Sequence, residues 1–138
     1  DVLPRISAMV TQYHPHDDIG ASIASGSYRT AGMIVAPCSI RTLSAIAGSA
    51  TDSLLVRAAD VQLKERRRLV LMVRESPLHL GHLRALAAVT EFGAIVAPPV
   101  PAFYARPATL AQAIDHIARR AIGLLDLDLS VSMPEWEG

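Results

Sequence analysis

Three short apolar runs alternate along the chain with longer segments of helical periodicity. The runs lie at residues 32–37, 69–73 and 94–97, and each is apolar throughout instead of at every second position. Continuous apolarity of this kind is typical of strands that are covered on both faces of a parallel sheet. We therefore predict three parallel strands at these positions.

The segments that follow the strands carry start and stop signals for helices. Ser39, Ser53 and Thr109 each stand where a hydroxyl can cap a helix N-terminus, and Gly48 and Gly93 stand where a helix can end. In the last segment, apolar residues recur at the spacing of one helical face. The predicted helices cover residues 40–47, 54 to about 66, 80–92 and 110 to about 125.

These elements follow one another as strand, two helices, strand, helix, strand, loop and helix. Such alternation predicts an α/β layered fold with right-handed crossovers, in which ligands bind at the carboxyl ends of the strands. The chain has 138 residues, which is enough for one domain and too few for two. We expect residues 1–138 to form a single α/β domain.

Composition narrows the classes of function. Thirteen Lys and Arg residues balance thirteen Asp and Glu residues, so the chain lacks the positive field that sequence-independent binding of nucleic acid requires. No apolar stretch reaches the roughly 18 residues of a membrane span. Cys38 is the only cysteine, which excludes an internal disulfide and a zinc site with paired Cys/His ligands. We expect a cytoplasmic protein that binds neither nucleic acid nor membrane and holds no metal.

The first candidate site follows the first predicted strand, at residues 37–42. Ser39 offers a hydroxyl cap, the next residues offer free backbone N–H groups, and Arg41 adds a cation, a combination that suits a phosphate. Ordinary helix capping beside an exposed arginine explains the same pattern. Cys38 could be a nucleophile, but the sequence places no base beside it, and a buried structural role is more usual.

The second candidate site combines a helix with the end of a strand. Arg57, Asp60 and Lys64 share one face of the second predicted helix, where the two cations could bind an anion and Asp60 could orient them. A solvated stripe of ion pairs also fits this spacing. Arg74 and Glu75 come directly after the second strand, either as a functional pair or as a surface ion pair.

The third candidate site is the proline-rich segment 98–107, which follows the last strand. Its four prolines fix an extended loop that presents Phe103 and Tyr104. The loop could hold these aromatic rings over a planar ligand, although such segments also serve as stiff linkers. Arg119 and Arg120 follow in the last predicted helix, where at least one of them should be exposed.

Four motifs follow one another along the chain: GMIVAPCSIRTL at residues 32–43, RAADVQLKERR at 57–67, LVLMVRESPL at 69–78 and PAFYARP at 101–107, and IASGSYRT at 23–30 precedes them. Taken together, they resemble the motifs of the UbiX-type flavin prenyltransferases. The likeness extends from about residue 19 to residue 120. It implies a Rossmann-like, flavodoxin-like parallel sheet flanked by helices.

The resemblance implies an enzyme that joins the dimethylallyl group of dimethylallyl phosphate to reduced FMN. The product, prenylated FMN, is a cofactor for decarboxylases of the UbiD type, which would be the functional partner. Family members use no metal, because cationic side chains can stabilise the departing phosphate. They assemble as homo-oligomers, commonly dodecamers, with active sites at the contacts between subunits.

The resemblance also implies roles for individual residues. The positions that contact FMN correspond to Ser39, Ile40, Arg41, Thr42 and Arg74. The positions that hold the prenyl phosphate correspond to Lys64, Tyr104 and Arg120. The other active-site positions correspond to Arg57 and Glu75, and Glu75 is the expected proton-transfer group.

The sequence departs from the family in three places. Arg41 stands where Lys is common, and Asp52 and Ser53 stand where Asp and Asn are usual. The family opens with a strand and a Gly/Ser-rich turn that cradles the flavin phosphate, and residues 1–138 contain no counterpart. We therefore expect a domain that is N-terminally incomplete relative to the family, whether or not residues precede Asp1. Near the other end, Trp136 could anchor packing or help the tail fold over a neighbouring active site.

Two alternatives stay open. A non-catalytic FMN-binding or assembly subunit of an aromatic-acid decarboxylase system would need a flavin site but no prenyl pocket. A flavin-dependent decarboxylase of cysteine-containing substrates, from the same superfamily, would need His- and Asn-rich substrate motifs, which the sequence does not show. The preference for a mono- or a diphosphate ester is open as well.

Overall fold

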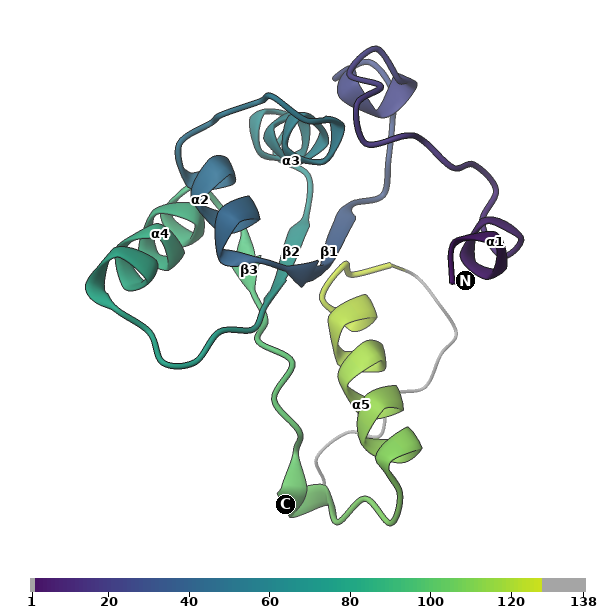
Figure 1. Cartoon of the computed structure of the whole chain (residues 1–138), viewed down its shortest axis with the longest axis vertical. Helices are drawn as coiled ribbons and strands as arrows, with labels where there is room; N and C mark the ends of the chain where they lie inside the picture. Colours follow the sequence, from purple (N-terminus) through teal and green to yellow (C-terminus); the bar gives the residue numbers. More distant parts are fainter. Residues whose placement is uncertain (1, 128–138) are drawn as a thin grey trace.

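The sheet consists of β1 (Met33–Cys38), β2 (Leu69–Val73) and β3 (Ile95–Val96), arranged in the order β1-β2-β3. Both pairs of neighbouring strands are parallel, as a computed structural model of the chain shows (Figure 1). The structure describes residues 2–127. The three predicted strands are thus confirmed, although β3 is shorter than the apolar run that predicted it.

Four helices follow the strands at the predicted positions: α2 (Ile40–Ala47), α3 (Leu54–Lys64), α4 (Leu80–Glu91) and α5 (Leu110–Gly123). The three predicted hydroxyl caps are all present, because each hydroxyl accepts a hydrogen bond from a backbone N–H in the first turn. The donor–acceptor distances are 3.1 Å for Ser39, 3.4 Å for Ser53 and 3.2 Å for Thr109.

The start of α4 was not predicted from a cap, because its cap is a histidine. His79 Nδ1 accepts a hydrogen bond from Gly81 N at 3.0 Å. Three short elements also escaped the sequence analysis: the helix α1 (Leu3–Ser7) and the 3₁₀ turns η1 (Ser22–Ala24) and η2 (Phe103–Ala105). Each spans five residues or fewer, which is too short for a periodic pattern to show.

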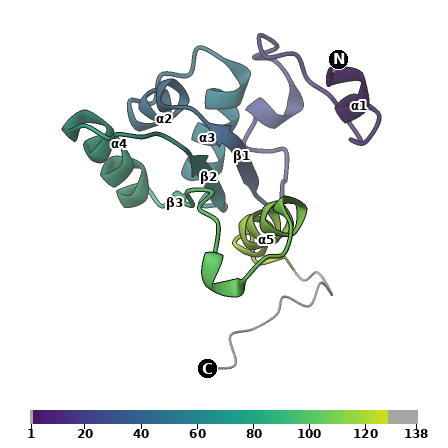
Figure 2. The same cartoon turned by 60° about the horizontal axis from the view of Figure 1, so that its bottom comes forward.

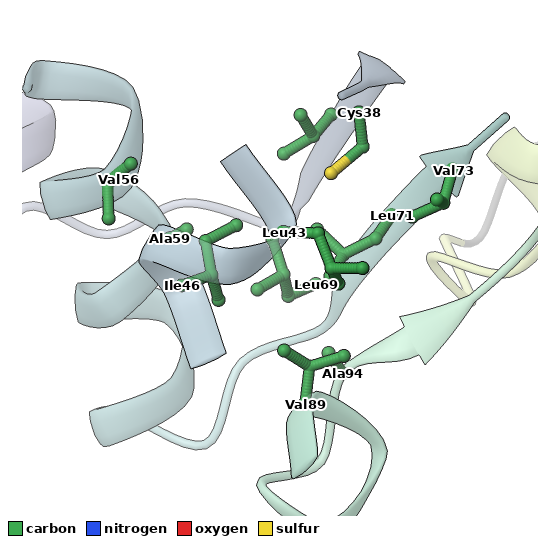
Figure 3. Close-up of a cluster of buried hydrophobic side chains, with 11 residues drawn as sticks. Cys38, Leu43, Ile46, Val56, Ala59, Leu69, Leu71, Val73, Val89 and Ala94 are labelled. Atoms are coloured by element: carbon green, nitrogen blue, oxygen red, sulfur yellow. The ribbon is translucent and has the colours of Figure 1, made fainter. Parts of the chain in front are cut away.

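The main core lies between one face of the sheet and the helices α2, α3 and α4. Leu43, Leu69, Leu71 and Val89 are fully buried there and come from α2, β2 and α4 (Figure 3). Because side chains alternate between the two faces of a strand, the intervening residues of β1 and β2 point to the opposite face. The helix α5 lies on that second face, so the sheet is flanked by helices on both sides (Figures 1 and 2).

A glycine permits the chain to enter β1. Gly32 has a φ of +155°, and a Cβ built on it would lie 2.9 Å from the carbonyl oxygen of Arg68. The next residue, Met33, donates its N–H to that same carbonyl oxygen at 2.9 Å. A side chain at position 32 would therefore push apart the first hydrogen bond between the segments that begin β1 and β2.

Asp1 and residues 128–138, including Trp136, lie outside the described residues. Within residues 2–127, no helix combines the length and the apolar character that crossing a bilayer requires. The same part of the chain holds no cluster of three or more His, Cys, Asp or Glu side chains arranged to bind a metal ion.

Candidate functional site

The carboxyl ends of β1 and β2 bring two candidate segments to the same edge of the sheet. Cys38 at the end of β1 is in register with Val73 at the end of β2. Ser39 and Arg74, which follow directly, therefore leave neighbouring strands at the same level. This is the edge at which parallel α/β sheets bind ligands.

A cavity of about 440 Å³ lies at this edge, beside the start of α2. Ser39, Arg41 and Thr42 line it together with His16 and Asp52. The Ser39 hydroxyl lies 3.1 Å from the Thr42 hydroxyl and also accepts the Thr42 backbone N–H. Three of the predicted FMN-contacting residues thus share one cavity with a helix N-terminus, where N–H groups and a guanidinium favour an anion.

Ile40 contributes to this site in a different way. Its side chain is half-buried and packs against the main core. Its backbone therefore offers a ligand at the start of α2 more than its side chain does. The arrangement fits the phosphate of FMN, because residues 39–42 supply hydroxyl and amide donors and Arg41 supplies the charge.

Cys38 is a structural residue of the core. Its side chain is 1% exposed, and burial raises the pKa of the thiol to about 11. The thiol points into the cluster of apolar side chains beneath α2 (Figure 3) and lies 3.7 Å from the carbonyl oxygen of Ser39. Since the thiol stays protonated at neutral pH, a role as nucleophile is disfavoured, in agreement with the sequence analysis.

The cations of α3 do not share one partner. Arg57 Nη1 lies 3.9 Å from Asp60 Oδ2, whereas Lys64 Nζ lies 2.6 Å from Glu65 Oε1. The hydrogen bond and charge of Lys64 lower the pKa of Glu65. Among the ion pairs of residues 2–127, Asp60 is thus the partner of Arg57 alone, and Lys64 is held at the far end of the helix.

The backbone of Gly26 lies directly against the Lys64–Glu65 pair. A Cβ at position 26 would lie 2.6 Å from Lys64 Nζ and would also overlap the Glu65 carboxylate. Arg67 fixes this approach, because its Nη2 donates to the Gly26 carbonyl at 2.7 Å. The predicted segment 23–30 therefore contacts the segment that carries Lys64.

Arg74 and Glu75 are both exposed at the end of β2. Glu75 Oε1 accepts a hydrogen bond from the backbone N–H of Ser76 at 3.0 Å. No ion pair joins Arg74 to Glu75 in the part of the chain that the structure describes. Both side chains are therefore available to a ligand at the carboxyl edge of the sheet.

Tyr104 and Arg120 line one cavity of about 280 Å³ between the proline-rich segment and α5. Met72, Val100 and Ile117 give this cavity apolar walls. The side chain of Tyr104 is 76% exposed, as expected of a loop that presents its aromatic residues. Two of the three predicted prenyl-phosphate residues thus come together within one chain, and Lys64 does not line their cavity.

The structure adds two histidines that the sequence analysis missed. His16 lines the cavity beside Ser39, because its carbonyl oxygen accepts the N–H of Leu54 at 2.9 Å and thereby ties residue 16 to the start of α3. No local pattern could have placed it there. His116 lines the cavity of Tyr104 and Arg120, and its spacing of four residues from Arg120 on a helix was a usable signal.

Comparison with known proteins places the chain in a family. The model of the flavoprotein family matches residues 8–120. The flavin prenyltransferase UbiX of Thauera aromatica is 55% identical over 133 residues, which cover 96% of this chain and 68% of that protein. The UbiX of Escherichia coli (strain K12) is 50% identical over 99% of this chain and 72% of its own length.

Two solved structures share the fold. AnUbiX (PadA1), crystallised with FMN and dimethylallyl pyrophosphate, superposes with a TM-score of 0.92 at 45% identity, over 98% of this chain and 71% of that one. A dodecameric FMN-dependent UbiX-like decarboxylase from Escherichia coli O157:H7 gives a TM-score of 0.90 at 41% identity, over 98% and 72%. These matches confirm the predicted flavodoxin-like α/β fold and the resemblance on which it was based. The chain belongs to the flavoprotein family and, within it, to the UbiX flavin prenyltransferases.

Proposed function

We propose that this chain transfers the dimethylallyl group of dimethylallyl phosphate to reduced FMN and so makes prenylated FMN. The observation that carries the proposal is the cavity shared by Tyr104 and Arg120, which combines a cation and a phenol with apolar walls. A phosphate ester of a short isoprenoid has the matching chemistry, because one end is anionic and the other is a five-carbon hydrocarbon.

The residues after β1 would hold the flavin. Ser39, Thr42 and the N–H groups of α2 would bind its phosphate, and Arg41 would balance the charge. Arg74, at the end of the neighbouring strand, would contact the same cofactor. When bound, reduced FMN supplies the nucleophile for the prenyl group.

The cations near the other cavity would bind the departing phosphate. Breaking the bond between the allylic carbon and oxygen leaves the bonding electron pair on the phosphate, and nearby cations stabilise the charge that develops there. Arg120 and Tyr104 supply this stabilisation within one chain, and Lys64 and Arg57 add to it. Glu75, at the carboxyl edge of the sheet, is the proposed proton-transfer group.

A homo-oligomer would join the separate groups into one site. Lys64 does not line the cavity of Tyr104 and Arg120 in the single chain, so in this proposal another copy supplies it. The helix α5 exposes apolar side chains that could form such a contact, because Leu110 is 77% exposed and Ile114 is 57% exposed. We infer a homo-oligomer, and a dodecamer like that of the Escherichia coli O157:H7 relative is the form that we expect.

The product defines the expected partner. Prenylated FMN has to be delivered to an enzyme that uses it, and we propose a UbiD-type decarboxylase for that role. A cytoplasmic location stays a prediction, which rests on the single cysteine of the sequence.

The proposal is tested by incubating the protein anaerobically with reduced FMN and dimethylallyl phosphate. We expect a flavin whose mass has increased by one dimethylallyl group, together with release of inorganic phosphate. Flavin that binds but gains no mass would instead favour a non-catalytic FMN-binding subunit. Release of carbon dioxide from a cysteine-containing substrate would favour the decarboxylase alternative.

A further inference from the structure

One arginine ties the segment that precedes β1 to the end of α3. Arg67 Nη1 donates to the carbonyl oxygen of Tyr28 at 2.8 Å, and its Nη2 donates to that of Gly26 at 2.7 Å. These two carbonyls belong to one turn, residues 25–28, in which Tyr28 donates its N–H to the Ser25 carbonyl at 3.2 Å. Hydrogen bonds from a charged donor are roughly twice as strong as neutral ones, so Arg67 fixes this Gly26 turn in place.

The backbone of Arg67 is anchored by the way in which α3 ends. Arg66 has a φ of 58°, in the left-handed region, and donates its N–H to the Leu63 carbonyl at 3.1 Å. Arg67 donates its own N–H to the Gln62 carbonyl at 2.8 Å. Together these two bonds form a Schellman motif. The position of Arg67 is therefore set relative to Lys64, the last residue of α3.

A further contact holds the same segment against α3. Thr30 Oγ1 donates to Gln62 Oε1 at 2.9 Å, and Gln62 is only 2% exposed. A buried amide oxygen that lost this partner would be left without a hydrogen bond, so the contact resists opening. The segment is thus held on the helix both at the Gly26 turn and two residues beyond it.

The Gly26 turn lies against the ammonium group of Lys64. A Cβ built at Gly26 would lie 2.6 Å from Lys64 Nζ and would also overlap Glu65 Oε1. The same oxygen of Glu65 accepts a hydrogen bond from Lys64 Nζ at 2.6 Å. The side chain of Lys64 is nevertheless 48% exposed. The turn and the carboxylate therefore restrict where the ammonium group can lie, while they leave it open to a ligand.

We propose that Arg67 is a positioning residue for Lys64, because it holds the Gly26 turn against the ammonium group that would bind the departing phosphate. This inference rests on the proposed function for the role of Lys64 itself. A lysine ammonium sits on a flexible four-carbon stem, so a fixed neighbour that excludes other positions reduces the entropy lost when an anion binds. Arg67 acts within the copy that supplies Lys64 and touches neither flavin nor substrate.

Acetylation of Lys64 tests the positioning without any turnover. Lys64 is the only lysine among residues 1–138, so a reagent for amines reports on it directly. The assembled protein is treated with acetic anhydride, and mass spectrometry follows the peptide that contains Lys64. We expect Arg67→Gln to react severalfold faster than the wild type, because the turn that covers the amine is released. Arg68→Gln is the matched control, since it removes a neighbouring arginine that pairs with Asp126, and it should keep the wild-type rate.

Kinetics with reduced FMN and dimethylallyl phosphate separates positioning from a general loss of structure. We expect Arg67→Gln to lower kcat/KM about tenfold, the usual size of a lost hydrogen bond from a charged group, and Arg67→Lys to recover part of it. If Arg67 acts through Lys64, the double variant of Lys64→Ala and Arg67→Gln should be no slower than Lys64→Ala alone. Losses that multiply in the double variant would overturn the proposal.

Gly26→Ala tests the same contact while Arg67 stays intact. The added Cβ should displace the Lys64 ammonium group, so acetylation should become faster and kcat/KM for dimethylallyl phosphate should fall. Gly20→Ala is the matched control, because a Cβ there would meet only Asp18 Oδ1, at an ordinary distance of 3.7 Å. If Arg67→Gln does not fold, this pair of glycine variants decides.

An Arg67→Gln protein that folds and acetylates at the wild-type rate would overturn the positioning role. Wild-type acetylation in Gly26→Ala would do the same. If the wild type prenylates no flavin, the proposed function fails, and the acetylation rates then decide by themselves whether Arg67 positions Lys64.

Discussion

Tyr104 and Arg120 line the same cavity, although Tyr104 lies in the turn η2 and Arg120 lies near the end of α5. The helix runs back from the end of the proline-rich segment toward the sheet, so its last turns lie beside the start of that segment (Figure 1). A phenol and a guanidinium that line one cavity in this way offer an anion-binding end to a pocket whose other walls are apolar.

Replacing Arg120 should impair use of the prenyl phosphate. We expect Arg120→Ala to lower kcat/KM for dimethylallyl phosphate by about a hundredfold, because the departing phosphate loses a cationic partner. FMN affinity, measured by fluorescence quenching, should stay unchanged, since Arg120 does not line the cavity at Ser39. Arg84→Gln, which changes an exposed arginine of α4 that lines neither cavity, serves as control. Wild-type kinetics in Arg120→Ala would contradict the assignment of the phosphate pocket.

Ser39 should combine a structural role with a role in binding. We expect Ser39→Ala to lower the free energy of unfolding by about 1 kcal/mol through loss of the cap, and also to weaken FMN binding. Thr109→Ala removes a cap of similar geometry from α5 but lies outside the flavin cavity. Chemical denaturation and flavin titration of both variants separate the two effects. If both variants bind FMN as the wild type does, Ser39 has no role beyond capping.

Two glycines should respond differently to alanine. Both Gly32 and Gly93 have positive φ values, of +155° and +104°, but only a Cβ at Gly32 would meet other atoms within 4 Å. We expect Gly32→Ala to lower the free energy of unfolding by about 2 kcal/mol or more, since strain and overlap add, and Gly93→Ala to cost less. Equal losses in urea denaturation would mean that backbone strain alone determines the cost.

The buried thiol of Cys38 should make stability depend on pH at the alkaline end. Its pKa is about 11 in the folded state, above the ordinary value of 9.0, so the folded chain retains a proton that the unfolded chain loses. The free energy of unfolding should therefore fall between pH 9 and 11, by at most about 1.4 kcal/mol for each pH unit. Cys38→Ala should lack this part of the decline. Parallel pH curves for the wild type and the variant would refute the burial of the thiol.

Mixed oligomers should show whether Lys64 acts across subunits. Lys64→Ala and Arg120→Ala should each be strongly impaired alone. When the two chains are co-expressed and assemble at random, about a quarter of the sites should receive an intact Lys64 from one copy and an intact Arg120 from another. Turnover should recover to about that fraction of the wild type. No recovery would mean that both residues of a site belong to the same chain.

Much of the fold was predictable because its signals are local. The apolar runs at β1 and β2 and the caps Ser39, Ser53 and Thr109 each depend on a few adjacent residues, and the structure confirms them. The histidine cap of α4 was not predicted, because His79 caps the helix only through the hydrogen bond that its Nδ1 accepts from the backbone N–H of Gly81. Likewise, α3 ends at Lys64, earlier than periodicity suggested.

The site was predictable only in part, for a physical reason. Ser39, Arg41 and Thr42 share a cavity because they are neighbours at one helix start. His16 lies beside them because its carbonyl oxygen accepts a hydrogen bond from the backbone N–H of Leu54. No spacing of residues in the sequence predicts this contact. The roles of Lys64, Arg57 and Glu75 came from the resemblance, and they stay predictions.

In the proposed oligomer, the exposed apolar side chains of α5 would link assembly to turnover, because the helix that presents Leu110 and Ile114 also carries Arg120. If copies separate on dilution, each released polypeptide loses the neighbour that completes its pocket. Specific activity should then decline with falling enzyme concentration instead of staying constant. An assay at very low enzyme concentration would underestimate the turnover number of the assembled enzyme. A concentrated stock of the Tyr104→Phe variant should restore the activity of such a diluted sample only if the wild-type copies assemble with the added subunits.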